Sequence, residues 1–247
     1  NGFFIWGRHA VLAALANPER RVATLYSTAD AAEDLQQAIT TLPSTRSTDL
    51  PPLAITKLQR LNRIIASGDK AVHQGMVAAV WPLDPPQLDD VLATTGREPL
   101  RVILLDQLSD PRNVGAIMRS ARAFGVTAII VTRRNTPEES GALARTATGA
   151  LEHVPMVRVV NLSRAIQKLQ AASITVAGLA SDGAMRVQSL SQFPRLAVVV
   201  GAEGSGLRRL TRSHCDHLVR IDINNDADSL NVSNAAAIAL YAASSRA

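Results

Sequence analysis

The sequence predicts an α/β protein in which a smaller N-terminal α/β domain precedes a larger domain built on a parallel sheet. From about residue 98 onward, stretches typical of strands alternate with stretches typical of helices, an order that favours a sheet covered by helices. Apolar runs without polar alternation, such as residues 196–200, are typical of parallel strands buried on both faces. Three prolines fall within residues 81–86 and oppose both helix and central strand, so we place the domain boundary there.

Residues 1–81 are expected to form the smaller domain and residues 82–97 a linker. The first helix should end near Asn17, because Pro18 cannot continue it. The alternation of helices and strands in this part again points to a layered sheet. The expected elements are, in order, the helix 8–15, the strand 22–26, the helices 31–40 and 55–64, and the strand 75–80.

Residues 98–247 are expected to form the larger domain. Ligands of parallel sheets gather at the carboxyl ends of the strands, so the loops that follow the strands are the candidate sites. The expected strands are 101–106, 128–132, 153–157, 175–178, 196–201 and 218–221. The expected helices are 114–124, 137–146, 162–170, 207–211 and 232–243.

The stretch 105–125 combines a strand, a polar turn and an arginine-bearing helix. The strand breaks at Asp110-Pro111, and the helix ends at Gly125, a residue typical of C-terminal caps. The apolar residues recur at helical spacing, and the arginines fall on the opposite face of the helix. The apolar set is Val114, Ile117, Met118, Ala121 and Phe124, and the basic set is Arg112, Arg119 and Arg122.

A glycine-rich turn follows the apolar run 196–200. Gly201, Gly204 and Gly206 surround Glu203 directly before a helix. Glycine permits close backbone approach and positive φ, and a helix start offers free N–H groups. The spacing matches neither the dinucleotide motif G-x-G-x-x-G nor a P-loop. A structural turn alone explains the glycines but leaves the carboxylate among them unexplained.

A polar loop within residues 221–234 separates the last expected strand from the last helix. Either Ser229 or Ser233 can cap that helix with its hydroxyl oxygen. Capping accounts for one serine but explains neither Asn231 nor the length of the polar loop before the helix. The loop is therefore the third candidate for a functional role.

The composition is that of an ordinary globular protein, with 247 residues, 47% hydrophobic and 19% charged. The formal net charge of +5 favours anionic partners such as RNA or DNA. Of the 26 basic residues three are lysines, so 23 are arginines, whose planar guanidinium suits phosphate. Arginine-rich codon usage explains the same ratio, so the charge by itself supports a nucleic-acid partner only weakly.

The single cysteine, Cys215, excludes an intramolecular disulfide and fits a reducing compartment. His214 and His217 flank it, but no second cysteine accompanies it, so we expect a packed or surface role and no bound metal. No stretch is long and apolar enough to cross a membrane, and the first residues lack a signal-peptide pattern. We therefore expect a cytoplasmic protein with no membrane partner.

Three separated motifs together resemble those of a known family. The motifs are, in chain order, Asn113-x-Gly115 with Arg119-Ser120-Ala121, then Gly201-x-Glu203-Gly204-x-Gly206, then Ser229-Leu230-Asn231-Val232-Ser233. In this order they resemble the three motifs of the SpoU (TrmH-type) branch of the SPOUT RNA methyltransferases. Residues 7–11, 72–78 and 210–216 resemble the subgroup that modifies a guanosine ribose in large-subunit ribosomal RNA.

The resemblance implies an S-adenosylmethionine-dependent RNA 2′-O-ribose methyltransferase. It implies a trefoil knot in the larger domain and an RNA-binding fold similar to ribosomal protein L30e in the smaller one. It further implies ribosomal RNA as the partner and a homodimer in which each active site is built at the interface. Two alternatives stay open: a methyltransferase that acts on transfer RNA, and a catalytically idle RNA-binding or ribosome-assembly factor on the same fold.

The resemblance also implies roles for individual residues. The cofactor-binding set is Gly201, Glu203, Gly204, Ile221, Ile223, Ser229 and Leu230. The catalytic set is Asn113, Arg119, Glu203, Ser229 and Asn231. The RNA-binding set is Arg8, His9, Arg112 and Arg122, of which His9 also fits a structural role and the last two also fit solvent-facing positions. The chain has Asp222-Ile223 and Asn225 where family members often have Pro-Met and glycine.

Arg119 is the base proposed for the family, yet a guanidinium almost never releases its proton in a protein. We therefore expect Arg119 to bind the phosphate beside the target ribose and to stabilise the developing alkoxide. Glu203 and Asn231 are expected to orient Arg119 and the backbone. The group that accepts the proton stays open.

Overall fold

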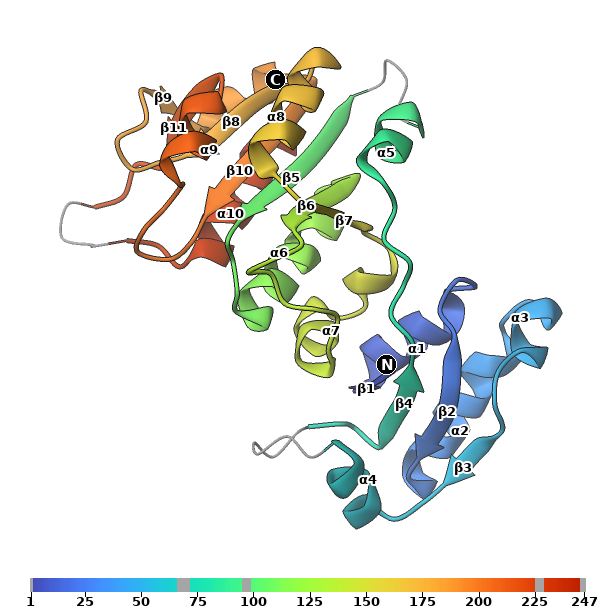
Figure 1. Ribbon diagram of the computed structural model, residues 1–247. Coiled ribbons are helices and arrows are strands. Elements are labelled where there is room, and N and C mark those ends of the chain that lie inside the picture. Colours follow the sequence, from blue (N-terminus) through green and yellow to red (C-terminus); the bar gives the residue numbers. More distant parts are fainter. Residues whose placement is uncertain (1, 66–71, 95–98, 225–228, 245–247) are drawn as a thin grey trace. The chain divides into compact units, whose positions relative to one another are not determined.

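The computed structural model of the protein describes residues 2–65, 72–94, 99–224 and 229–244 (Figure 1). Contacts within the chain divide it into two compact units. The first unit comprises Asn1–Asp84 and Glu138–His153, and the second comprises Pro85–Pro137 and Val154–Ala247. The segment Glu138–His153 thus lies in the first unit, although it falls inside the stretch expected to form the larger domain.

The first unit is built on a four-stranded mixed sheet in the order β1-β4-β2-β3. Strand β4 is antiparallel to both of its neighbours, and β3 pairs with β2 in parallel. The strands are β1 (Phe3–Trp6), β2 (Val22–Ser27), β3 (Leu53–Ile55) and β4 (Met76–Val80). The helices are α1 (Arg8–Ala16), α2 (Ala29–Thr40), α3 (Ser44–Thr48), α4 (Leu58–Ile65), α7 (Gly141–Ala147) and the 3₁₀ turn η1 (Ala150–Glu152).

A buried ion cluster ties Glu138–His153 to the segments just before β2 and just after β4. The side chain of Arg20 is fully buried and lies 2.7 Å from Glu139 and 2.9 Å from Glu152. Its guanidinium also donates to the carbonyl oxygen of Trp81 at 2.7 Å. Burial raises the pKa of the Glu139 carboxyl, and the charge of Arg20 opposes that rise. A charge this deeply buried needs partners, so the cluster fixes the position of the segment.

The second unit is built on a seven-stranded, fully parallel sheet in the order β7-β6-β5-β10-β8-β11-β9. The strands are β5 (Leu100–Asp106), β6 (Ala128–Thr132), β7 (Met156–Val159), β8 (Thr175–Leu179), β9 (Met185–Arg186), β10 (Arg195–Gly201) and β11 (His217–Arg220). The helices are α5 (Leu88–Thr94), α6 (Pro111–Ala123), α8 (Leu162–Ala171), α9 (Arg209–His214), α10 (Val232–Ser244) and the 3₁₀ helix η2 (Val187–Gln192).

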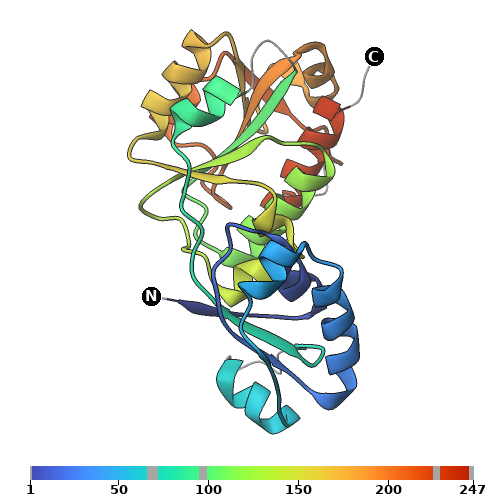
Figure 2. The ribbon, with the colours of Figure 1, turned by 90° about the vertical axis from the view of Figure 1, so that its right-hand side faces the viewer.

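Helices cover both faces of this sheet (Figure 2). On one face, Leu100, Val102 and Leu104 of β5 pack with buried side chains of α5 and α8. On the other face, α10 packs against α6, η2 and β10. Because all the strands are parallel, their carboxyl ends lie along one edge, as the sequence predicts for ligand-binding loops.

The structure confirms the predicted fold class, with a small mixed sheet in one unit and a parallel sheet in the other. The strand expected at 153–157 forms at Met156–Val159, because η1 and the turn after it occupy the preceding residues. Pattern reading misses the short elements β1, β3, α3, α5 and β9, which are too brief to show a period. The trefoil knot and the L30e-like fold stay predictions. No helix within the described residues is long and apolar enough to span a bilayer.

Candidate functional site

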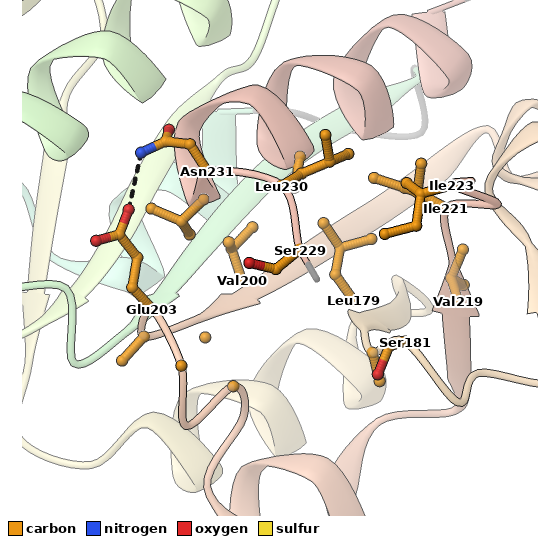
Figure 3. Close-up of a pocket in the computed structure, with 17 residues that line it drawn as sticks. Leu179, Ser181, Val200, Glu203, Val219, Ile221, Ile223, Ser229, Leu230 and Asn231 are labelled. Carbon is orange, nitrogen blue, oxygen red and sulfur yellow. Dashed lines mark hydrogen bonds between the residues drawn. The ribbon is translucent and has the colours of Figure 1, made fainter. Parts of the chain in front are cut away.

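A cavity of about 570 Å³ opens at the carboxyl ends of β8, β10 and β11, beside the start of α10 (Figure 3). All seven residues of the expected cofactor-binding set line it, and so does Asn231. The lining comprises Leu179, Ala180, Ser181, Val200, Gly201, Ala202, Glu203, Gly204, Gly206, Val219, Ile221, Ile223, Ser229, Leu230, Asn231, Val232 and Ala235. Two motifs far apart in the sequence therefore meet around one cavity.

The cavity has a polar end and an apolar end. Figure 3 shows Glu203 and Asn231 at one end and Val219, Ile221 and Ile223 at the other. Small-molecule sites in proteins are mostly apolar with a few placed polar groups, and this lining has that character. The arrangement fits a ligand with a flat apolar part and a polar, charged part.

The glycine-rich turn after β10 folds back on the end of its own strand. The N–H of Gly206 donates to the carbonyl oxygen of Ala202 at 2.9 Å, and the N–H of Ala202 donates to the carbonyl oxygen of Gly206 at 3.1 Å. A Cβ on Gly201 would lie 2.1 Å from the carbonyl carbon of Gly206, so no side chain fits there. At Gly204 an added Cβ would meet open space, but the φ of +77° is a backbone conformation that residues with a side chain rarely adopt. The turn thus needs glycine for two different reasons.

An ion pair closes the glycine-rich turn at its far end. Asp106, fully buried at the end of β5, lies directly opposite Gly201 in the sheet. Its carboxylate accepts from the Nε of Arg208 at 2.6 Å and from the backbone N–H of Arg208 at 3.0 Å. Sequence reasoning missed both residues. The available signal was a carboxylate directly after the apolar run Val102–Leu105, because an unpaired charge is rarely buried.

Three residues of the expected reaction centre form one hydrogen-bonded network. The side-chain amide of Asn231 donates to Glu203 Oε1 at 2.8 Å, and the amide of Asn113 donates to the same oxygen at 3.1 Å. Asn231 also donates to Asn113 Oδ1 at 3.2 Å. The backbone N–H of Ser233 donates to Asn231 Oδ1 at 2.9 Å, which fixes the orientation of that amide. The network joins α6, the glycine-rich turn and α10.

Arg119 lies outside this network. It is exposed on α6, six residues after Asn113, and does not line the cavity. Its guanidinium makes no hydrogen bond or ion pair with any residue in the described part of the chain. Glu203 and Asn231 bind Asn113 rather than Arg119, and Ser229 lines the cavity without joining the network. Within one chain, Arg119 is therefore not part of the cavity.

The expected RNA-binding residues occupy exposed positions. Arg112 and Arg122 lie exposed on α6, and His9 is exposed on α1. Arg8 forms a two-point pair with Asp34, with Nε–Oδ2 of 2.7 Å and Nη2–Oδ1 of 3.0 Å. The Arg8 guanidinium lowers the pKa of the Asp34 carboxyl through this hydrogen bond. Arg8 is therefore less free for phosphate than the two α6 arginines.

Cys215 has the packed role expected from the sequence. Burial, reinforced by the charges of Asp216 and Asp106, raises the pKa of Cys215 to about 12. Its Sγ lies 3.3 Å from the carbonyl oxygen of Thr211. A thiol with this pKa is not ionised near neutral pH, so it does not act as a nucleophile. Among the described residues, no three His, Cys, Asp or Glu side chains gather as a metal site would require.

Comparison with known proteins assigns more than half of the chain to one family. Residues 100–241 match the SpoU rRNA Methylase family. The chain is 36% identical over 245 residues to the protein of Vibrio vulnificus named 23S rRNA (guanosine-2′-O-)-methyltransferase RlmB, covering 97% of this chain and 95% of that protein. It is 41% identical over 178 residues to the protein of that name in Escherichia coli K12, covering 71% and 72% of the two chains.

Solved structures share the fold. The SpoU methyltransferase AviRb from Streptomyces viridochromogenes, in complex with AdoMet, superimposes with a TM-score of 0.79 at 24% identity, over 98% of this chain and 89% of that one. An AdoMet-bound rRNA methyltransferase from Sinorhizobium meliloti gives a TM-score of 0.78 at 22% identity, over 98% and 86%. At these identities the likeness supports the fold.

We expect Gly201→Ala to weaken S-adenosylmethionine binding more than tenfold, because the added Cβ clashes with the Gly206 backbone and must displace the turn that lines the cavity. Gly204→Ala is the matched control, since its Cβ meets open space and only the positive φ is strained, at a cost of about 1–2 kcal/mol. Isothermal titration calorimetry measures both affinities, and thermal melting checks the fold. Equal losses in the two variants would show that the close approach at Gly201 does not shape the cavity.

Proposed function

This chain belongs to the SpoU rRNA Methylase family, and we propose that it methylates the 2′-oxygen of a guanosine ribose in 23S ribosomal RNA. The observation that carries the proposal is the cavity at the end of the parallel sheet, which every residue of the expected cofactor-binding set lines. Relatives with the 23S rRNA guanosine activity in their names match almost the whole chain, which supports this substrate. Such a protein acts in the cytoplasm, where ribosomes assemble.

The cavity fits S-adenosylmethionine in size and chemistry. Its volume of about 570 Å³ lies in the range usual for small-molecule sites. The apolar lining around Leu179, Ile221 and Leu230 suits an adenine ring, and the open backbone of the glycine-rich turn offers hydrogen-bonding groups. When bound, the cofactor supplies an electrophilic methyl group on a positively charged sulfur.

The network of Asn113, Glu203 and Asn231 would position the reacting ribose. Three hydrogen bonds hold its members in place, so the polar end of the cavity is organised before the RNA arrives. Holding two reactants in line contributes several kcal/mol to catalysis. Glu203 Oε1 is saturated by the two amides, which keeps this carboxylate fixed beside the cavity.

Arg119 would bind the phosphate beside the target ribose and stabilise the negative charge that develops on the 2′-oxygen. A guanidinium binds phosphate with two parallel hydrogen bonds, and it stabilises an alkoxide electrostatically without giving up its own proton. Arg112 and Arg122 lie on the same helix and would bind further phosphates. In the first unit, Arg8 and His9 would contact RNA more loosely, because Arg8 already pairs with Asp34.

We expect Arg119→Lys to remove most methyl transfer while S-adenosylmethionine affinity stays within about twofold of wild type. The substitution keeps the charge but loses the fork that binds phosphate at two points. Arg119 does not line the cavity, so cofactor binding should not depend on it. Tritium incorporation from labelled cofactor measures transfer, and calorimetry measures binding. Unchanged turnover would remove Arg119 from the mechanism.

We also propose that the active protein is a homodimer with each reaction centre at the interface. In support, the arginine needed for the chemistry lies outside the cavity of its own chain. Apolar side chains on α10 and just before it are also exposed, with Leu230 at 37%, Ile238 at 38% and Tyr241 at 63% of their full area. Phe124 packs edge-on against Tyr241 and continues this surface onto α6. Exposed apolar clusters of this kind are typical of subunit contacts.

Mixing two inactive variants tests the shared reaction centre. If Arg119 and the cavity come from different protomers, Arg119→Ala mixed with Asn231→Ala should regain activity. Random exchange gives hybrid dimers in half of the population, each with one intact centre, so about a quarter of wild-type activity is expected. The unmixed variants are the controls. No recovery, with exchange demonstrated by tagged subunits, would show that one chain supplies the whole centre.

Mapping the modified nucleotide tests the function itself. The protein is incubated with labelled S-adenosylmethionine and total RNA from a strain that lacks the gene, and the labelled nucleotide is located. We expect a single 2′-O-methylguanosine in 23S rRNA. Label in transfer RNA would overturn the assignment of 23S rRNA as the substrate. No label, despite measured cofactor binding, would favour a catalytically idle RNA-binding or assembly factor.

A further inference from the structure

A second cavity in the same unit carries an unusual concentration of positive charge. It has a volume of about 260 Å³ and lies between the start of α5, the loop after β6, the end of β7 and the first two turns of α8. Its lining comprises Gln87, Leu88, Asp89, Arg133, Arg158, Val159, Val160, Asn161, Arg164, Ala165 and Lys168. We call it the α8 groove. None of the residues assigned above to the reaction centre or to RNA binding belongs to it.

The lining of the α8 groove contains four basic side chains and one carboxylate, that of Asp89. Lys168 Nζ lies 2.9 Å from Asp89, so these two charges compensate each other. Arg158 donates from Nη2 to the carbonyl oxygen of Pro137 at 2.7 Å. The side chains of Arg133 and Arg164 are exposed and make no hydrogen bond or ion pair within the described residues. Three arginines therefore remain without a counter-charge in the groove.

The position of Arg164 is electrostatically unfavourable in the free protein. It lies in the first turn of α8, where the aligned peptide dipoles already produce a positive end. Lys168 follows four residues later on the same helix face, but Asp89 compensates its charge, so Arg164 itself has no counter-charge. The backbone N–H of Arg133 donates to the carbonyl oxygen of Val159 at 2.8 Å, which places the main chain of Arg133 beside the end of β7. An anion in the groove would supply the counter-charge that Arg133 and Arg164 lack.

We propose that the α8 groove is a second RNA-binding surface, which holds the sugar-phosphate backbone of the substrate away from the reaction centre. The inference rests on the proposed function. Arginine forks match phosphate geometry, and the groove holds three of them. Its lining contains no aromatic side chain on which a base could stack, so it would bind backbone rather than read sequence.

The groove is placed so that one RNA segment can reach both sites. The cofactor cavity lies at the carboxyl ends of β8, β10 and β11, and the groove lies at the ends of β6 and β7 along the same edge. In the sheet order only β5 lies between β6 and β10, so the nearest strands of the two sites are two spacings of about 4.8 Å, or roughly 10 Å, apart. A few nucleotides span that distance.

Neutralising the free arginines tests the proposal. We expect Arg133→Gln, Arg164→Gln and the double variant to weaken binding of protein-free 23S rRNA, with at least a tenfold loss in the double variant. The slope of log affinity against log salt should fall by about one per arginine removed. Affinity for S-adenosylmethionine should be unchanged. Filter binding measures the RNA affinity over a salt series, and methyl transfer gives KM for RNA separately from kcat.

Arg134→Gln is the matched control, because Arg134 is the next residue of the same exposed loop and does not line the groove. We expect less than a twofold change in RNA affinity. An equal loss of RNA affinity in this control would show a general charge effect and overturn the proposal that the groove binds RNA. Unchanged RNA affinity in the double variant would also overturn it. Failure of wild-type protein to methylate rRNA would refute the proposed function instead, while direct RNA binding would still decide the role of the groove.

Discussion

The ion pair between the buried carboxylate of Asp106 and the exposed Arg208 supports the candidate active site. A carboxylate with no exposed surface must be paired, and here both partners on Arg208 lie just beyond the glycine-rich turn. The pair closes the loop at one end, and the contact of Gly201 with the Gly206 backbone closes it at the other. The wall of the cofactor cavity and the position of Glu203 depend on this closure.

The closed loop also explains why the polar network forms. Glu203 projects from a turn held by two backbone hydrogen bonds, and its carboxylate accepts from the amides of Asn113 and Asn231. These amides come from helices on the same face of the sheet, α6 and the start of α10, which pack against each other. Binding the cofactor and positioning the ribose thus share one rigid framework, whereas the positive charges for RNA lie around it on α6 and in the α8 groove.

Segments distant in sequence build both units. In the first unit, the buried side chain of Arg20 holds Glu139 and Glu152, which follow it by more than a hundred residues. Gly141 packs so closely on β1 that a Cβ would lie 1.8 Å from the Trp6 ring. Local periodicity predicts neither contact. In the sequence, the residues of the ion cluster are ordinary charged residues, and Gly141 is an ordinary glycine.

The sequence by itself determined the parallel sheet, its longer strands and helices, and the motifs that line the cavity. Apolar runs and helical spacing are local properties, so β5, β6, β10 and α8 could be read directly. The tertiary structure decided which side chains meet: Glu203 with Asn113 and Asn231, and Asp106 with Arg208. It also placed Arg119 outside its own cavity and gathered the arginines of the α8 groove. Such pairings depend on how strands are ordered in the sheet, which no local pattern encodes.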